Sequence, residues 1–324
     1  MLKSFCRHAA ASALLFVAIA AGALAQQYPN KPIRLLVGFA AGGPSDVAAR
    51  VISQKLAEKW GQQVIVDIRP GAAGNIATEL AAKAPPDGYT LLEPAFAHAV
   101  NPILYPKLPF DATRDFAPIL LFASIANLLV VHPSLPVHSV KELIAFAKTR
   151  PDQLTFGSAG SGTASHFAGE LLNTMGGVKI THIPYKGLAP AHTEVIGGQL
   201  SLMFDGLVTG LPAAKAGRLR ALAVTTLKRW QGAPDIPTMS EAGLAGFEVN
   251  SWYGLLAPAG TPREIITRLN TEVARSLREP DARERLYSIG AEPMSGTPEQ
   301  FAAYIQSEMT KWAKVVKAAN IKAE

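Results

Sequence analysis

The chain has 324 residues, of which 48% are hydrophobic and 17% charged, with a formal net charge of +6 and a single cysteine. This length suits two compact lobes, and the apolar fraction excludes a mainly disordered chain. One cysteine excludes an internal disulfide, a zinc ribbon and an iron–sulfur centre. The Lys and Arg residues are dispersed, which argues against nucleic-acid binding.

Residues 1–25 have the organisation of a secretory signal peptide. Lys3 and Arg7 form a positive n-region, an apolar stretch follows, and Ala23 and Ala25 are the small residues that a cleavage site requires. The alternative is an N-terminal membrane anchor, but the apolar stretch is shorter than the roughly 20 residues of a spanning helix. We therefore expect export to the periplasm, with the signal peptide cleaved after Ala25.

The remaining chain alternates predicted strands and helices. Short apolar runs bounded by turns predict buried strands, and apolar residues at helical spacing predict helices. The predicted strands cover residues 33–37, 64–66, 154–156, 200–204 and 219–224, and the predicted helices begin near residues 45, 75, 139, 163, 188, 261 and 297. Strand–helix–strand units of this kind build parallel sheets covered by helices, so the pattern predicts an α/β fold.

Three of the predicted helix starts have the pattern of a capping box, in which two side chains bond the free backbone N–H groups of the first turn. The pairs are Ser139 with Glu142, Thr261 with Glu264, and Thr297 with Gln300. In the last helix, Trp312 falls on the apolar stripe, and we expect it in the core.

Four glycine-rich turns follow predicted strands, at residues 38–45, 71–75, 160–165 and 187–190. The first has the glycine spacing of a P-loop, but Pro44 replaces the essential Lys, which argues against nucleotide hydrolysis. In the third turn, Ser165 stands at the last glycine position of a dinucleotide fingerprint, which weakens that hypothesis. Each turn alone is explained by helix capping. Together they favour a shared pocket in which unpaired N–H groups at helix starts bind an anion.

Patterns for catalysis and metal binding are weak. No G-x-S-x-G motif surrounds Ser158 or Ser161, and His166 with Glu170 is an incomplete metal-ligand pair. Asp46 could simply cap a helix, and Asp205 could equally take part in a turn. We expect no enzymatic activity, no metal and no cofactor.

Several motifs occur in a fixed order from about Tyr28 to the end of the chain. They include Tyr28-Pro29-Asn30-Lys31-Pro32, Gly42-Gly43-Pro44-Ser45-Asp46, Arg69-Pro70-Gly71-Ala72, Pro86-Asp87-Gly88-Tyr89-Thr90, Ser158-Ala159-Gly160-Ser161-Gly162-Thr163, His182-Ile183-Pro184-Tyr185-Lys186-Gly187 and Ala257-Pro258-Ala259-Gly260-Thr261-Pro262. In these motifs the chain resembles the extracytoplasmic solute-binding proteins of tripartite tricarboxylate transporters, the Bug-type receptors, over nearly its whole length after the signal peptide.

The resemblance implies an α/β periplasmic binding protein fold of type II, a Venus flytrap. Its two lobes would each contain a mainly parallel sheet flanked by helices, joined by two crossover strands. We expect lobe 1 to comprise residues 26–126 and 250–324, and lobe 2 to comprise residues 127–249. The ligand, a small organic acid, would lie between the lobes, its carboxylate held by loop N–H groups and bridging waters.

The resemblance also implies ligand contacts from loops of both lobes. The expected ligand-binding residues are Phe39, Ala41, Gly42, Gly43, Ser45, Asp46, Asn75, Glu93, His98, Ser158, Ser161, Gly162, Thr163, His166, Tyr185 and Asp205. Glu93 lies in a loop that the family varies. It is a candidate for selecting a ligand amine or hydroxyl, and the alternative is a solvated loop acid.

The implied partners are a carboxylate ligand and two membrane permease subunits, one large and multi-span, the other small with four spans. We expect a monomer that binds no nucleic acid. Two alternatives stay open: a receptor that signals to a membrane kinase and, with less support, an exported enzyme on the same fold.

Overall fold

The computed structural model describes residues 28–105, 107–185, 187–319 and 321. The expected signal peptide at residues 1–25 lies outside these ranges, so its cleavage stays a prediction. Within them, none of the helices is both long and apolar enough to cross a membrane.

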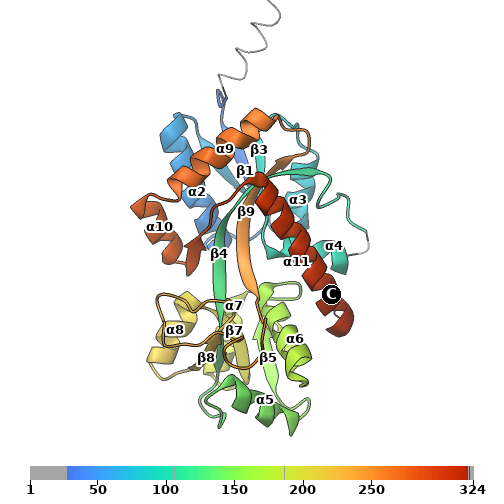
Figure 1. Cartoon of the computed structure of the whole chain (residues 1–324), viewed down its shortest axis with the longest axis vertical. Helices are drawn as coiled ribbons and strands as arrows, with labels where there is room; N and C mark the ends of the chain where they lie inside the picture. The colour runs from blue at the N-terminus through green and yellow to red at the C-terminus, as the bar shows by residue number, and fades with distance from the viewer. Residues whose placement is uncertain (1–27, 106, 186, 320, 322–324) are drawn as a thin grey trace, which may run out of the picture.

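The described chain forms two α/β lobes, one above the other in Figure 1, which confirms the predicted fold class. Sheet A, in the first lobe, has the strand order β2-β1-β3-β9-β4, with β10 beside β4. Sheet B, in the second lobe, has the order β4-β7-β5-β6, with β8 beside β4. The strands are β1 (Ile33–Val37), β2 (Val64–Ile68), β3 (Thr90–Glu93), β4 (Phe116–Val131), β5 (Thr155–Ser158), β6 (Thr181–Pro184), β7 (Leu202–Gly206), β8 (Arg220–Val224), β9 (Asn250–Pro258) and β10 (Ala291–Pro293).

Helices cover both sheets. Those of the first lobe are α2 (Pro44–Trp60), α3 (Asn75–Ala82, preceded by a short 3-10 turn at Ala72–Gly74), α4 (Phe96–Leu104), α9 (Arg263–Ser276), α10 (Pro280–Tyr287) and α11 (Pro298–Ala319). Those of the second lobe are α5 (Val140–Lys148), α6 (Ala164–Gly176), α7 (Leu188–Ile196) and α8 (Leu207–Lys215). Helices α2, α9 and α10 pack on one face of sheet A, and α3, α4 and α11 pack on the other.

The predicted strands are observed as β1, β2, β5, β7 and β8. In β1, Ile33, Leu35 and Val37 pack beneath α2 and α9, whereas Leu36 packs into the core on the opposite face. Since side chains alternate between the two faces of a strand, a strand covered on both faces is apolar at every position. This double burial explains why β1 appears in the sequence as a continuous apolar run.

Strand β4 belongs to both sheets. It is 16 residues long, and its first part pairs with β9 from Phe116↔Pro258 to Ala126↔Asn250. Its last five residues pair with β7 and β8 in sheet B. Figure 1 shows β4 and β9 passing side by side between the lobes, so these are the two crossover strands.

The pairing of β4 fixes the direction of the other strands. Strand β9 is antiparallel to β4, β3 is antiparallel to β9, and β1 and β2 run parallel to β3. These three strands therefore run with β4, toward the second lobe. Strand β7 is antiparallel to β4, and β5 and β6 run parallel to β7, toward the first lobe. Each sheet is thus mixed, and the carboxyl ends of its parallel strands face the other lobe.

The capping box predicted at Thr297 and Gln300 is confirmed, and that at Ser139 and Glu142 is confirmed for the Ser139 bond alone, because the Glu142 carboxylate accepts from the His138 N–H. The Glu142 N–H donates to Ser139 Oγ, and the Gln300 N–H donates to Thr297 Oγ1, at 3.2 Å in both cases. The third prediction is wrong. The Thr261 hydroxyl donates instead to the Pro258 carbonyl at 2.7 Å, and the cap position of α9 is Pro262.

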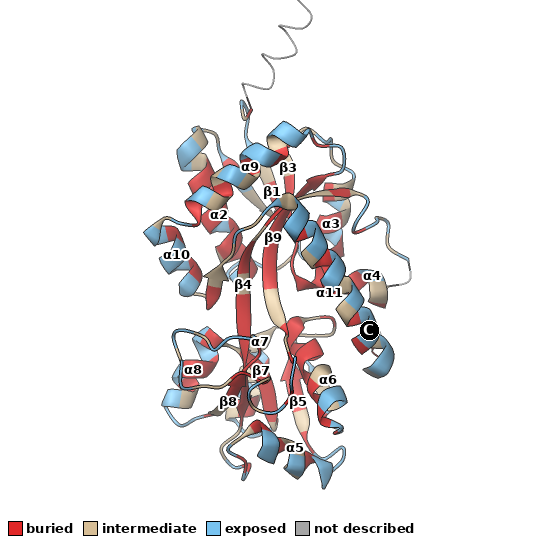
Figure 2. Cartoon of the chain, in the orientation of Figure 1, coloured by how far each residue is buried: buried red, intermediate tan, exposed pale blue. Residues whose placement is uncertain are grey.

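One apolar core extends across both lobes on the side of α11. At its centre, the rings of Phe96 on α4, Phe167 on α6 and Trp312 on α11 meet edge to face, with centroids 5.1 to 5.5 Å apart. Trp312 is fully buried, as predicted. Figure 2 shows buried residues continuing along β4 from one lobe to the other, whereas β9 is of intermediate burial where it begins. The last helix therefore fastens the first lobe to the second.

Replacing Trp312 with Ala is expected to lower the free energy of unfolding by about 3–5 kcal/mol, the usual cost of truncating a buried Trp. Trp230, only partly buried at the edge of another core, provides the matched control. Chemical denaturation of Trp312→Ala and Trp230→Ala measures both losses. A loss for Trp312→Ala no greater than for Trp230→Ala would contradict this role of the cluster.

Candidate functional site

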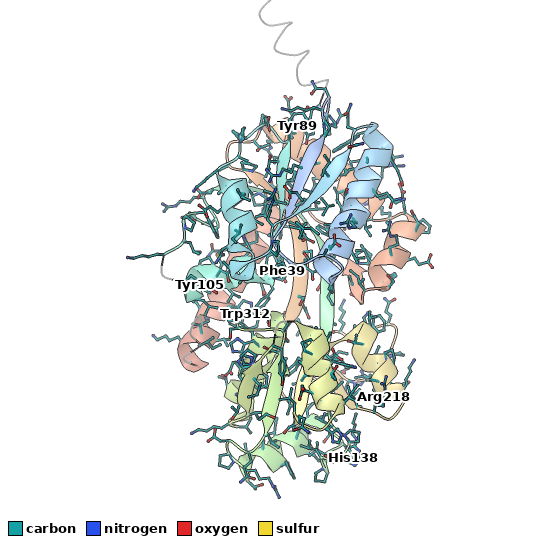
Figure 3. The ribbon with its side chains drawn as sticks, turned by 180° about the vertical axis from the view of Figure 1, so that it is seen from behind. Phe39, Tyr89, Tyr105, His138, Arg218 and Trp312 are labelled. Carbon is teal, nitrogen blue, oxygen red and sulfur yellow. The ribbon has the colours of Figure 1, made fainter. Side chains whose placement is uncertain are left out.

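The expected ligand-binding residues lie at the two facing sheet edges. The loops that follow β1, β2 and β3 share the carboxyl edge of sheet A, and those that follow β5, β6 and β7 share the carboxyl edge of sheet B. Figure 3 shows Phe39 at the end of the first lobe that faces the second, and Tyr89 at the far end. Ligands of open α/β sheets bind outside the carboxyl ends of strands, so these edges are the candidate site.

In the first lobe, the loop between β1 and α2 is closed by the helix that follows it. Gly42 has a φ of 80°, and its N–H donates to Asp46 Oδ2 at 2.9 Å. Asp46 in turn forms an ion pair with Arg50. The cap position of α2 is Gly43, which offers no side chain to the first turn. The first-turn N–H groups of α2 therefore carry no side-chain cap and can bind an anion.

The loop between β5 and α6 repeats this arrangement in the second lobe. Gly162 has a φ of 83°, and its N–H donates to His166 Nδ1, also four residues along, at 3.2 Å. The cap residue Thr163 makes no side-chain cap bond to the helix, and its hydroxyl donates to the Gly160 carbonyl at 2.7 Å. Helix α6 therefore also begins without a side-chain cap.

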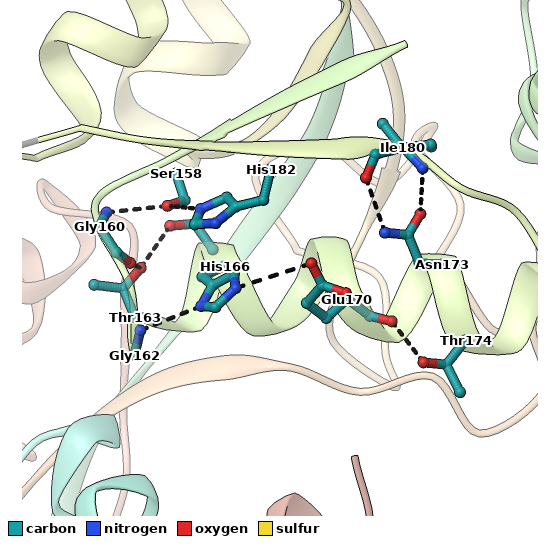
Figure 4. Close-up of polar contacts among 11 residues, drawn as sticks. Ser158, Gly160, Gly162, Thr163, His166, Glu170, Asn173, Thr174, Ile180 and His182 are labelled. Carbon is teal, nitrogen blue, oxygen red and sulfur yellow. Dashed lines mark hydrogen bonds and ion pairs between the residues drawn. The ribbon is translucent and has the colours of Figure 1, made fainter. Parts of the chain in front are cut away.

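Figure 4 shows the side chains that fix this second loop. Ser158 Oγ accepts the Gly160 N–H at 3.0 Å and lies 2.7 Å from His182 Nε2. The rings of His182 and His166 stack with their centroids 4.0 Å apart. Burial, and secondarily the neighbouring His182, lowers the pKa of His166 to about 3. His166 is therefore neutral at pH 7, as its acceptor role toward Gly162 requires.

The Ser158–His182 pair has the composition of a nucleophile with its base, but its surroundings do not suit catalysis. Ser158 is fully buried, whereas a nucleophile must reach its substrate. The hydroxyl instead bonds the backbone of its own loop. Among the described residues, no group of three or more His, Cys, Asp or Glu side chains could hold a metal ion.

Asp205 lies one residue before the end of β7 and is fully buried, and burial raises the pKa of its carboxyl despite its bonds to His192, Thr209 and Gly206. Its Oδ1 accepts from the Gly206 N–H at 2.8 Å and from Thr209 at 2.9 Å, and its Oδ2 lies 2.6 Å from His192 Nδ1. Both oxygens are thus occupied by protein groups. Asp205 holds the start of α8 at the sheet edge, and a direct ligand contact is not supported.

Three other expected residues lie in loops at the facing sheet edges, Tyr185 and Ser161 in the second lobe and Ala41 in the first. The Tyr185 N–H donates to the Ser158 carbonyl at 3.2 Å, which places this half-buried ring beside the β5–α6 loop. Ala41 is exposed and Ser161 is half-buried, one in each of the two glycine loops. These positions bring the tips of both loops to the boundary between the lobes.

The first-lobe edge contains a small pocket beside Glu93. Glu93 is only 2% exposed, accepts a hydrogen bond from the Ser45 hydroxyl, and lines the pocket with Phe39 and His98. Burial, and secondarily the charge of Asp46, raises the pKa of Glu93 well above its usual range, although the Ser45 bond opposes this. Glu93 is therefore not a solvated loop acid.

Three residues that were not among the expected ligand-binding residues complete these networks. Ser165 Oγ accepts the Ala159 N–H at 3.0 Å, and His182 bonds Ser158. Asn101 donates to Asn75 Oδ1 at 2.7 Å and lines the pocket of Glu93. His182 belongs to one of the family motifs, but only the fold shows which polar atoms His182 and Asn101 face.

His98 gives the site a pH-dependent stability. Burial lowers its pKa to about 4, against an ordinary value of 6.5, and its Nε2 lies 2.9 Å from the Ala112 carbonyl. The unfolded chain therefore binds more protons between pH 6.5 and 4, so stability falls as the pH falls through this window.

The change His98→Asn is expected to remove up to about 1.4 kcal/mol per pH unit from the slope of unfolding free energy against pH. Denaturant titrations between pH 7 and 4 measure the slope, and the difference from wild type cancels the contributions of His166 and Glu93. The exposed His138, at the far end of the second lobe in Figure 3, is the control. Equal slopes for His98→Asn and wild type would exclude a neutral, buried His98.

Comparison with known proteins agrees with this geometry. A family model described as the tripartite tricarboxylate transporter family receptor matches residues 48–321. A protein of the tcbD–tcbE intergenic region of Pseudomonas sp. is 40% identical over 89% of this chain and 86% of its own length. BugT of Bordetella pertussis is 36% identical over 94% of each chain.

Among solved structures, Rpa4515 of R. palustris with adipate is 42% identical, with a TM-score of 0.82 over 91% of this chain and 99% of its own. MatC of Rhodopseudomonas palustris with bound malate is 34% identical, with a TM-score of 0.77 over 89% of this chain and 100% of its own. The chain therefore belongs to the tripartite tricarboxylate transporter receptor family, a family of periplasmic solute-binding receptors and not of enzymes.

Proposed function

We propose that this chain captures a small organic acid between its two lobes and delivers it to a tripartite tricarboxylate-type membrane transporter. The observation that carries the proposal is the pair of uncapped helix starts, α2 and α6, at sheet edges that face each other. Unpaired N–H groups and the helix dipole favour a carboxylate at such positions.

The relatives support the same ligand class. Rpa4515 was solved with adipate and MatC with malate, and both ligands are carboxylates. In this chain, Arg50 is already paired with Asp46, which agrees with recognition by loop N–H groups.

The binding energy that this mode requires is modest. A micromolar dissociation constant corresponds to about −8 kcal/mol. Hydrogen bonds to a charged group contribute about 1.5–3 kcal/mol each. Four to six such bonds from both lobes would therefore suffice after the losses of ordering. A ligand that bonds both lobes also favours the closed arrangement, since only that arrangement offers both sets of donors.

In this proposal the receptor acts in the periplasm as a monomer after cleavage at Ala25. Residues 127–249 form the second lobe, and the partners are a large multi-span and a small four-span permease subunit. A receptor that signals to a membrane kinase would bind its ligand in the same way. Uptake of the identified acid by cells with and without this receptor separates the two functions, because loss of a purely signalling receptor leaves uptake unchanged.

A panel of mono-, di- and tricarboxylates, acidic amino acids and neutral solutes, screened by thermal shift and isothermal titration calorimetry, tests the ligand class. A bound acid at 100 times its dissociation constant is expected to stabilise the protein by about 2.7 kcal/mol. Stabilisation by neutral solutes and by none of the acids would overturn the carboxylate proposal.

The change Ala164→Pro tests the helix start of α6 directly. Position 164 is the first residue of α6, where Pro fits the helix, and Thr163 before it is extended (φ −86°, ψ 160°), as a residue before Pro prefers. The substitution removes one N–H donor and gives α6 the same first residue type as α2, which begins with Pro44. We expect it to weaken acid binding about 10- to 100-fold, the equivalent of one charged hydrogen bond.

Arg263→Pro is the matched control, because it places Pro at the first position of α9, which lies away from the site in Figure 1. Calorimetric titration of both variants with the best acid of the panel gives the comparison. If Ala164→Pro binds as tightly as Arg263→Pro, the α6 start is not part of the site.

A further inference from the structure

The pocket beside Glu93 contains three buried polar atoms without a hydrogen-bond partner among the described residues. They are Glu93 Oε1, His98 Nδ1 and Asn101 Oδ1. Their side chains are at most 5% exposed, and all three residues line the same pocket. Burying an unpaired polar atom costs about 1–3 kcal/mol, so three of them in one place indicate a functional demand.

Each of these atoms is an acceptor when Glu93 is ionised. The Asn101 amide donates both of its hydrogens, to the Ala73 carbonyl at 3.0 Å and to Asn75 Oδ1 at 2.7 Å, which leaves Oδ1 with free lone pairs. His98 Nε2 faces the Ala112 carbonyl and therefore bears the hydrogen, so Nδ1 carries the lone pair. Glu93 accepts from Ser45 at Oε2, which leaves Oε1 free.

The pocket lies at the edge of sheet A that faces the second lobe. Besides the three polar residues, its wall includes Gly38 and Phe39 from the β1–α2 loop and Gly74 from the start of α3. These segments form the carboxyl edge of sheet A. The cavity volume is about 10 Å³, which is room for about one water molecule and hence for one small polar group.

We propose that this pocket receives the protonated amine of the ligand, so that the receptor binds amino acids or closely related amine-bearing acids. An ammonium group donates three hydrogens to three acceptors, and its positive charge favours the ionised form of Glu93. Around an ionised Glu93, a hydroxyl donates one hydrogen and a water molecule two, so neither satisfies all three acceptors. The N–H groups at the starts of α2 and α6 bind the carboxylate of the same ligand. The inference therefore rests on the proposed function.

Matched pairs of acids test the inference with the wild-type protein alone. Glutamate with glutarate and aspartate with succinate differ only by the amine, and malate carries a hydroxyl in its place. Isothermal titration calorimetry at pH 7 is expected to show the amine-bearing member of at least one pair binding at least tenfold more tightly than its amine-free partner and than malate.

The change Glu93→Gln assigns the preference to the pocket. It keeps the shape of the side chain but removes the charge, and its amide can present N–H donors to the cavity. We expect it to reduce binding of the preferred amine-bearing acid at least tenfold and to leave its amine-free partner within about twofold of wild type. Glu79→Gln is the control, because Glu79 pairs with Lys83 on α3 and does not line the pocket.

The outcomes separate this inference from the proposed function. If acids bind but the amine adds no affinity, or if the hydroxyl acid is preferred, the ammonium subsite is overturned and the carboxylate site stands. If Glu93→Gln weakens both members of a pair equally, the pocket does not read the amine. If none of the acids binds, the proposed function fails and the inference fails with it. If Glu93→Gln does not fold, the comparison of amine-bearing and amine-free acids on the wild-type protein still tests the ammonium subsite.

Discussion

The backbone pairing of β4 is the constraint on which the rest of the molecule depends. This strand is bonded to β9 along its first part and to β7 and β8 along its last five residues. Because antiparallel pairing reverses direction at each step, the parallel strands of the two sheets are forced to point at each other. The loops that follow these strands therefore lie at the boundary between the lobes. This geometry determines the position of the candidate site.

The glycine loops that precede α2 and α6 have the same local structure in the two lobes. Gly42 and Gly162 each turn the chain in the left-handed region and bond a side chain four residues along, Asp46 in one case and His166 in the other. The loops are held rigid by their own helices while the helix starts remain uncapped. Beside the first loop, the pocket of Glu93 offers the opposite chemistry, acceptors in place of donors. The site as a whole is suited to a ligand with both an anionic and a donor group.

Sequence patterns predicted the helices and strands well where neighbouring residues alone determine the structure. The bounds of β1 follow from a doubly buried apolar run, and the cap of α5 follows from the Ser139–Glu142 spacing. The cap predicted at Thr261 failed because α9 begins at Arg263 with Pro262 in the cap position, and the Thr261 hydroxyl donates to the Pro258 carbonyl. The sequence also marked Glu93 as a selector and left its burial open. It could not pair Glu93 with Ser45 or bring Asn101 into the same pocket, because these contacts join loops that only the sheet order makes adjacent.

The position of β9 has a consequence for the order in which the chain can assemble. All strands of sheet B, from β4 to β8, lie within residues 116–224, so this sheet is complete before β9 is synthesised. Sheet A is interrupted until then, because β9 is the strand that separates β3 from β4. A chain that ends before residue 250 leaves the facing edges of β3 and β4 unpaired, and open edges of this kind invite pairing with other chains. Sheet A can therefore close only once the chain beyond residue 249 is present.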